Sequence, residues 1–156
     1  MDNKKEHTKY PYARVKAMAE FMEFIQEPNW KPEKIDSELL KRLGMAQGKE
    51  REAIRALTFL GLVDEVGVPT GEFDNLKKDY QGALKRLVAE KYSELFSLIP
   101  ARLANQERLV KFFGTSVDTA EYQAKLFVWF CKQAGIELPN VEEHFHRARF
   151  DKENSE

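Results

Sequence analysis

The sequence predicts a mainly α-helical protein, in which a winged-helix-like N-terminal part with a short β-hairpin precedes a helical C-terminal bundle. Apolar residues recur every three or four positions along much of the 156-residue chain, which is the spacing of an amphipathic helix. This spacing changes between residues 62 and 70, where Val, Gly and Pro lie close together. With 42% hydrophobic and 12% aromatic residues, the chain can bury a sizeable core.

Residues 10–73 are expected to hold three short helices. The first lies between Pro11 and Pro28, because a helix interior rarely contains proline. Its apolar face consists of Val15, Met18, Ala19, Met22 and Ile25. The second begins after Asp36, whose carboxylate can cap a helix, and stops at Gly44. Its buried residues are expected to be Leu39, Leu40 and Leu43.

The third helix is expected over Lys49–Leu60, with Gly61 as its stop signal. Its inner face consists of Ala53, Ile54, Leu57 and Leu60. The next segments, Leu62–Glu65 and Val68–Thr70, flank a two-residue turn and are interpreted as a short hairpin. Pro69 donates no ladder hydrogen bond, so its strand must be an edge or very short. Three helices followed by a small hairpin is the order of a winged helix.

Residues 74–150 are expected to form a helical part that packs on the first. Asp74 is the expected cap of a long helix over Asn75–Ile99, and a shorter helix follows over Asn105–Phe113. The next helix is expected over Val117–Ala134, between Ser116 as its cap and Gly135 as its stop.

The two ends of the chain are expected to differ from this helical pattern. Residues 1–9 are charged and predicted to be flexible, as is the tail at residues 151–156. Before that tail, Asn140 and Glu143 have the spacing of a capping box, which predicts a terminal helix after Pro139.

The helix expected over residues 117–134 is apolar on almost every side. One face carries Ala and Phe, and four larger residues extend it around the helix: Tyr122, Leu126, Trp129 and Phe130. Its polar strip is limited to Asp118, Glu121, Lys125 and Lys132. A helix of this kind is buried on several sides, so it is either central to the bundle or part of a subunit interface.

Charge and cysteine content narrow the class of protein. The net charge is −1, unlike the basic balance typical of nucleic-acid-binding domains. Cys131 is the only cysteine, so no internal disulfide or cysteine metal pair is available. The chain has neither an apolar signal segment nor the roughly 20 apolar residues of a membrane span. The expected location is therefore the cytoplasm.

No stretch of the sequence matches a catalytic or metal centre. Gly44–Lys49 has three residues between its glycines and Glu50 after its lysine, so it does not match a phosphate-binding loop. The cluster Glu142, Glu143, His144 and His146 lacks the further ligands that a metal site usually needs. Cys131 lies on an apolar helix face, where a thiol is inert. We therefore expect no enzyme activity, no cofactor and no metal.

The outward face of the helix over residues 49–60 is the most informative surface. A helical wheel places Arg51, Arg55 and Phe59 on it at four-residue spacing. In a helix-turn-helix this would be the recognition helix, and Lys41 and Arg42 would add phosphate contacts. The alternative is that C-terminal helices or another protein cover this face, with the arginines paired to carboxylates. Residues 1–72 carry 12 Lys and Arg against 13 Asp and Glu, which favours the covered alternative.

Several stretches together resemble a known family. They are Tyr10-Pro11-Tyr12, Ala56–Asp64, Gly67–Thr70 and Phe127–Ile136, with a signature of the form LxFLGLVD…GxPT. The chain is similar over nearly its whole length to a prokaryotic family of uncharacterised proteins that carry a domain of unknown function. The resemblance implies a winged-helix-type N-terminal part with a helical continuation. It implies no activity and no site residues.

The leading functional expectation is a non-enzymatic binding module that acts through protein–protein contacts, including self-association. It rests on the nearly all-apolar helix over residues 117–134 and on Phe59 beside otherwise polar residues. The alternative is a winged-helix regulator that binds duplex DNA through the helix over residues 49–60. No membrane partner is expected.

Overall fold

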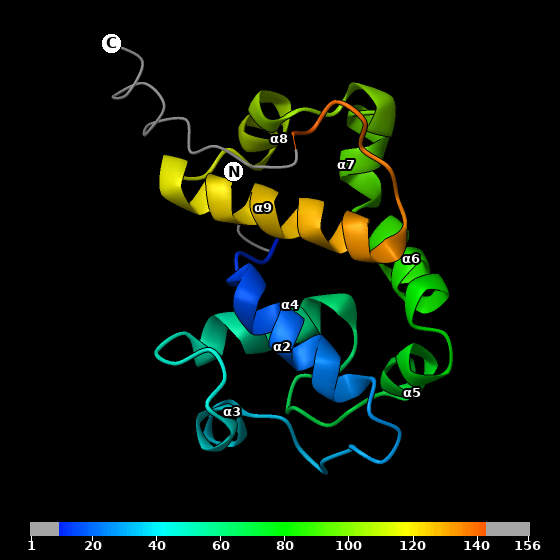
Figure 1. The fold of residues 1–156 in the computed structure, drawn as a ribbon. Coiled ribbons are helices and arrows are strands. Elements are labelled where there is room, and N and C mark those ends of the chain that lie inside the picture. Colours follow the sequence, from blue (N-terminus) through cyan, green and yellow to red (C-terminus); the bar gives the residue numbers. More distant parts are fainter. Residues whose placement is uncertain (1–9, 143–156) are drawn as a thin grey trace.

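The computed structural model describes residues 10–142, which form eight α-helices and one short 3₁₀ helix in two stacked layers (Figure 1). In chain order these are α2 Val15–Ile25, α3 Ser37–Leu43, α4 Glu50–Leu60, α5 Gly71–Lys78, α6 Tyr80–Lys91, α7 Ser93–Leu98, η1 Ala101–Leu103, α8 Gln106–Phe113 and α9 Val117–Ala134. Helices α2 to α5 form one layer, α7 to α9 form the other, and α6 joins them along one side. The mainly α class is confirmed for the described residues.

The three N-terminal helices lie where the sequence predicts them. Asp36 caps α3 by accepting a hydrogen bond from the Leu39 amide at 3.0 Å. Gly61 ends α4 in the left-handed conformation at φ 82°, a backbone region that favours glycine. The predicted inner face of α3 is partly wrong, because only Leu40 is buried, whereas Leu39 is half-buried and Leu43 is 37% exposed. Helix α3 has only seven residues and lies at the edge of the layer, so it buries only a narrow stripe.

The inner face of α4 is close to the prediction. Ala53, Leu57 and Leu60 are buried as expected, and Ala56 joins them. Ile54 is only half-buried, so it packs at the margin of the core.

The predicted hairpin is reduced to a tight turn. Val63 and Pro69 form a single antiparallel bridge, and residues 10–142 contain no sheet. The Asp64 carboxylate holds the turn by accepting from the amides of Val66 at 3.0 Å and Val68 at 2.9 Å. The Thr70 amide donates to the Leu62 carbonyl at 3.0 Å, closing the loop behind the bridge. Residues 64–68 form the turn, so the predicted strands do not extend beyond the bridge.

The long helix predicted over residues 75–99 is wrong, because the chain folds into α5, α6 and α7 instead. Thr70, not Asp74, caps α5, with its hydroxyl accepting from the Glu72 amide. Asp79 then leaves the helical region at φ −150° and ψ 85°, and its carboxylate accepts from the Gly82 amide. This cap begins α6 at Tyr80, whereas the spacing of apolar residues predicted one continuous helix.

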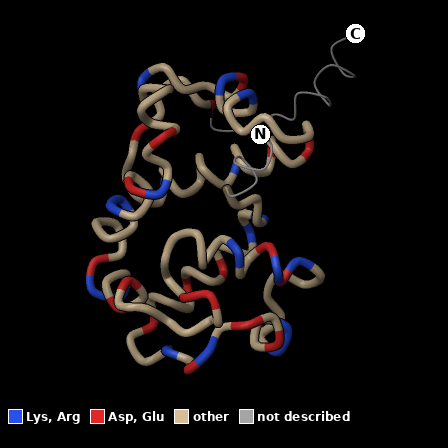
Figure 2. The backbone as a smooth tube through the Cα atoms, turned by 180° about the vertical axis from the view of Figure 1, so that it is seen from behind, with Lys and Arg blue, Asp and Glu red and all other residues tan. Residues whose placement is uncertain are grey.

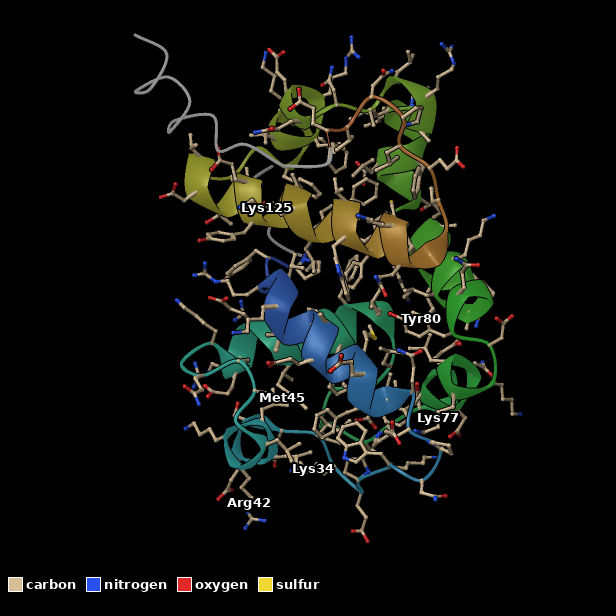
Figure 3. The ribbon with its side chains drawn as sticks, in the orientation of Figure 1. Lys34, Arg42, Met45, Lys77, Tyr80 and Lys125 are labelled. Carbon is tan, nitrogen blue, oxygen red and sulfur yellow. The ribbon has the colours of Figure 1, made fainter. Side chains whose placement is uncertain are left out.

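The new direction of α5 ties it to α2 and leads into α6 (Figure 3). The Lys77 ammonium donates to the carbonyls of Ile25 at 2.7 Å and Glu27 at 2.5 Å, so it caps the C-terminal end of α2. At the start of α6, the Tyr80 hydroxyl donates to Gln133 of α9 at 2.8 Å. Because the helix breaks between them, Lys77 bonds to the layer that contains α2 and Tyr80 bonds to the layer that contains α9.

Helix α9 has its predicted bounds, with Ser116 as its cap and Gly135 in the left-handed conformation. It packs against α2, α6 and α8, which makes it central to the described fold. Its polar strip is narrower than predicted, because Glu121 is only 3% exposed. Contacts with three helices leave little of its circumference for solvent.

Tyr10 lies where the two layers meet. It is 1% exposed, and its ring stacks on Tyr92, between α6 and α7, at 5.5 Å between centroids. Its ring also makes edge contacts with Phe59 of α4 at 5.7 Å and Phe113 of α8 at 5.5 Å. The Tyr10 carbonyl accepts from the buried Gln123 side chain of α9 at 3.0 Å. One residue of the N-terminal segment thus contacts three helices and the junction between α6 and α7.

Some predictions concern residues outside the described part of the chain. They are the flexible ends at residues 1–9 and 151–156, the terminal helix after Pro139, and the residues Glu143, His144 and His146. Within residues 10–142, none of the helices has the length and apolarity that crossing a membrane requires.

Candidate functional site

The predicted arginines of α4 are accessible and lie in a common hollow. Arg51 and Arg55 are exposed on the N-terminal half of α4, one helical turn apart. They line a depression of about 610 Å³ together with Lys41 of α3 and Lys49 of the connecting loop. Arg42 is exposed on α3 but is not part of the lining. Three of the four cationic residues that line the hollow, Lys41, Arg51 and Arg55, were predicted as contact residues from the sequence.

Two carboxylates also line the hollow, and both are held by other groups. Glu50 is 8% exposed, and its carboxylate accepts from the Gly48 amide at 3.2 Å, which fixes the turn before α4. Glu52 lies 4.0 Å from the Arg14 guanidinium and 3.8 Å from the Lys49 ammonium. Neither carboxylate forms an ion pair with Arg51 or Arg55.

The remaining cations have no protein counter-ion. Within residues 10–142, the side chains of Lys41, Arg51 and Arg55 form no hydrogen bond or ion pair. This contradicts the expectation that the arginines are paired to carboxylates. An open hollow with three unpaired cations favours an anionic ligand, since each charge remains available to it.

The loop at residues 44–49 determines how close these cations are. Met45 is 3% exposed and inserts into the core between α2, α3 and α4 (Figure 3). Ala46 has φ 53°, and Gly44 and Gly48 flank it with φ 72° and 78°. Repeated left-handed residues turn the chain sharply, so Lys49 faces the same hollow as Lys41. Sequence reasoning excluded this segment as a phosphate-binding loop and did not select Lys49 as a contact residue.

Phe59 is separated from the arginines by its own packing. It is half-buried, with its ring 5.1 Å from Tyr92 and 5.7 Å from Tyr10. The outward face predicted for α4 is therefore divided. Its N-terminal half, with Arg51 and Arg55, is open, and its C-terminal half is covered by the chain itself.

The four residues that make α9 apolar all round pack within the chain to different extents. Leu126 and Phe130 are fully buried, and Tyr122 and Trp129 are half-buried. The Trp129 ring lies 5.7 Å from that of Phe130, and the Arg14 guanidinium lies 4.0 Å from the centre of the Tyr122 ring. Of the two alternatives for this helix, the central position in the bundle accounts for its apolar surface.

Other residues with reactive side chains are not brought together. Cys131 is fully buried, and burial raises the pKa of its thiol well above the usual range. A thiol of this kind is a poor nucleophile because little thiolate forms. No group of three or more His, Cys, Asp and Glu side chains in residues 10–142 is placed to hold a metal ion.

Charge is distributed over all of the helices. Figure 2 shows basic and acidic residues interspersed along the chain in both layers. The hollow is therefore a local excess of positive charge on a protein with a net charge of −1.

Phe59→Ala should destabilise the fold much more than Arg55→Ala. Removing the Phe59 ring from between Tyr10 and Tyr92 should lower the free energy of unfolding by about 2–3 kcal/mol, less than the 3–5 kcal/mol typical of a fully buried phenylalanine. Removing the exposed Arg55 side chain should change it by no more than about 0.5 kcal/mol. Urea unfolding followed by circular dichroism measures both. A destabilisation by Arg55→Ala as large as that by Phe59→Ala would contradict an open hollow.

Comparison with known proteins identifies the chain only at the level of its family. No curated protein and no solved structure matches it. The model of a family of unknown function, DUF5343, matches residues 11–137. This match includes α3 and α4, which line the hollow, and all of α9, and it confirms the resemblance to a family without an assigned activity. The chain therefore belongs to DUF5343, a family of unknown function.

Proposed function

We propose that this chain is a non-enzymatic binding module of the winged-helix type that binds duplex DNA through the N-terminal half of α4. The observation that carries this proposal is the pair Arg51 and Arg55. They are exposed, one turn apart and unpaired within the described residues, and they share a hollow with Lys41 and Lys49.

The order and pairing of the N-terminal elements support the winged-helix type. Helices α2, α3 and α4 are followed by the turn at residues 63–69. The Ile35 amide donates to the Gly67 carbonyl at 2.7 Å, so the segment between α2 and α3 lies against that turn. In this proposal residues 10–73 form the winged-helix part and residues 74–150 the part packed on it, with the boundary inside α5.

The chemistry of the hollow suits a recognition helix. Residues near the N-terminus of such a helix contact base edges in the major groove, and arginine pairs with the O6 and N7 atoms of guanine. Lys41 and Lys49 flank the arginines and are suited to phosphate contacts. The turn after α4 carries Asp64 and Glu65, which phosphates would repel. The proposed contact is therefore made by α3 and α4, without the turn.

The leading expectation from the sequence, a protein–protein contact, has less support than DNA binding. Phe59 packs on Tyr10 and Tyr92, and the apolar sides of α9 pack on α2, α6 and α8. Neither feature requires a second chain. The open hollow, in contrast, has a charge that no described residue neutralises.

The proposal is tested by titrating a fluorescent mixed-sequence duplex of about 20 base pairs with the full chain at low salt. Arg51→Gln/Arg55→Gln should weaken binding at least tenfold, since each good arginine contact is worth about 1–3 kcal/mol and 1.4 kcal/mol is a factor of ten. Arg102→Gln is the matched control, because Arg102 is exposed on η1 in the other layer.

Two results would reject DNA binding at this site. One is a double variant that binds the duplex as tightly as the wild-type chain. The other is a wild-type chain that neither binds mixed-sequence duplex at low salt nor enriches any sequence from a random duplex library.

A further inference from the structure

We infer that the contact with the DNA backbone extends beyond α3 and α4, across the start of α2 and onto α9. This inference rests on the proposed function. Its first observation is a second hollow of about 330 Å³ on the other side of the loop at residues 44–49. Arg14, Lys16 and Lys49 supply its positive charge. Lys49 lines both hollows, so the two are adjacent.

The path continues from the second hollow to the other layer through Arg14. The Arg14 guanidinium lies 4.0 Å from the centre of the Tyr122 ring, on α9. The Lys125 ammonium lies 5.9 Å from the centre of the same ring. Helices α2 and α9 are in contact, and Figure 3 shows Lys125 on α9, in the layer above α2.

The charge along this path is positive. The two hollows are lined by six cationic side chains and three carboxylates, those of Glu20, Glu50 and Glu52. Glu50 is bound to the Gly48 amide and Glu52 lies between two of the cations, so the six cationic side chains still outnumber the three carboxylates along the path. On a chain with a net charge of −1, this is a local excess that spans α3, α4 and α2 and reaches Lys125 on α9.

A chain of phosphates fits this path better than a single anion does. Two hollows that share one lysine can each accept a phosphate, and a duplex backbone supplies them at regular intervals. Arg14 is a positioning residue in this path, because Tyr122 and Glu52 hold its guanidinium in place. Lys16 is exposed and Lys125 is half-buried, so their ammonium groups are suited to direct phosphate contact.

The test compares Lys16→Gln/Lys125→Gln with the wild-type chain on a duplex of about 20 base pairs over a range of salt concentrations. Each lost phosphate contact lowers the slope of log Kobs against log salt by about 0.9, so the slope should fall by about 2. Lys85→Gln/Lys132→Gln is the control, because these lysines are exposed on α6 and at the far end of α9.

The outcomes separate this inference from the proposed function. If the wild-type chain binds and the double variant keeps its slope, the extended path is wrong and DNA binding by α4 stands. A fall in slope that is equally large for Lys85→Gln/Lys132→Gln also overturns the path. If the wild-type chain binds no duplex, the proposed function fails first. Lys16→Gln alone, at an exposed position, should lower the slope by about 1 and serves if the double variant does not fold.

Discussion

Tyr10→Ala should lower the free energy of unfolding by about 3–5 kcal/mol, the range for removing a large aromatic side chain from a protein core. The Tyr10 ring is almost completely buried and packs on aromatic residues from α4, from α8 and from the junction between α6 and α7. Its removal leaves a cavity between two layers, where no single helix can move to fill it. Urea unfolding, followed by tryptophan fluorescence and circular dichroism, measures the loss.

Tyr12→Ala is the matched control for this prediction. Tyr12 is two residues away and half-buried, and it lines the basic hollow instead of the aromatic cluster. Its removal should cost about 1 kcal/mol or less. Similar losses for the two variants would show that the N-terminal segment matters for its backbone contacts and not for the Tyr10 ring.

The bounds of most helices follow from local signals. Asp36 and Ser116 cap the helices that the sequence assigned to them, and Gly44, Gly61 and Gly135 end helices in the left-handed conformation. These signals act within four residues, so one sequence is enough to find them.

The break at Asp79 has a different cause. The spacing of apolar residues continues across the break, because α5 and α6 each bury one face. This spacing does not reveal that the second helix runs in a new direction. Only the side-chain bond from Asp79 to the Gly82 amide and the contact of Lys77 with α2 distinguish two helices from one. The second of these joins residues about fifty positions apart, beyond the reach of a pattern argument.

The residues of the candidate site could also be predicted from the sequence only where local patterns determine their position. The helical wheel correctly placed Arg51 and Arg55 outside, because the buried positions of α4 determine its exposed ones. It did not show that Tyr10 covers Phe59, since that contact depends on the route of the N-terminal segment. The inclusion of Lys49 and Lys16 depends on the conformation of the loop at residues 44–49, which its composition does not specify.

Leu57→Ala should lower the free energy of unfolding by about 2–5 kcal/mol. Leu57 is fully buried on the inner side of α4, where it faces residues from α2, α3 and the following loop: Met18, Phe21, Leu40 and Met45. The space among them is small, about 10 Å³, so the packing is close and the deleted atoms leave a new cavity. Leu43→Ala is the control, since Leu43 is 37% exposed and should lose less than about 1 kcal/mol.

The same variant separates the stability of α4 from its proposed binding surface. Leu57 lies on the inner side of the helix, whereas Arg51 and Arg55 lie on the outer side. Below its melting temperature, folded Leu57→Ala protein should therefore bind duplex DNA with the affinity of the wild-type chain, while Arg51→Gln/Arg55→Gln should melt normally and bind weakly. A loss of stability below about 0.5 kcal/mol for Leu57→Ala would mean that the other side of α4 faces the core. The arginines would then not be available to any ligand.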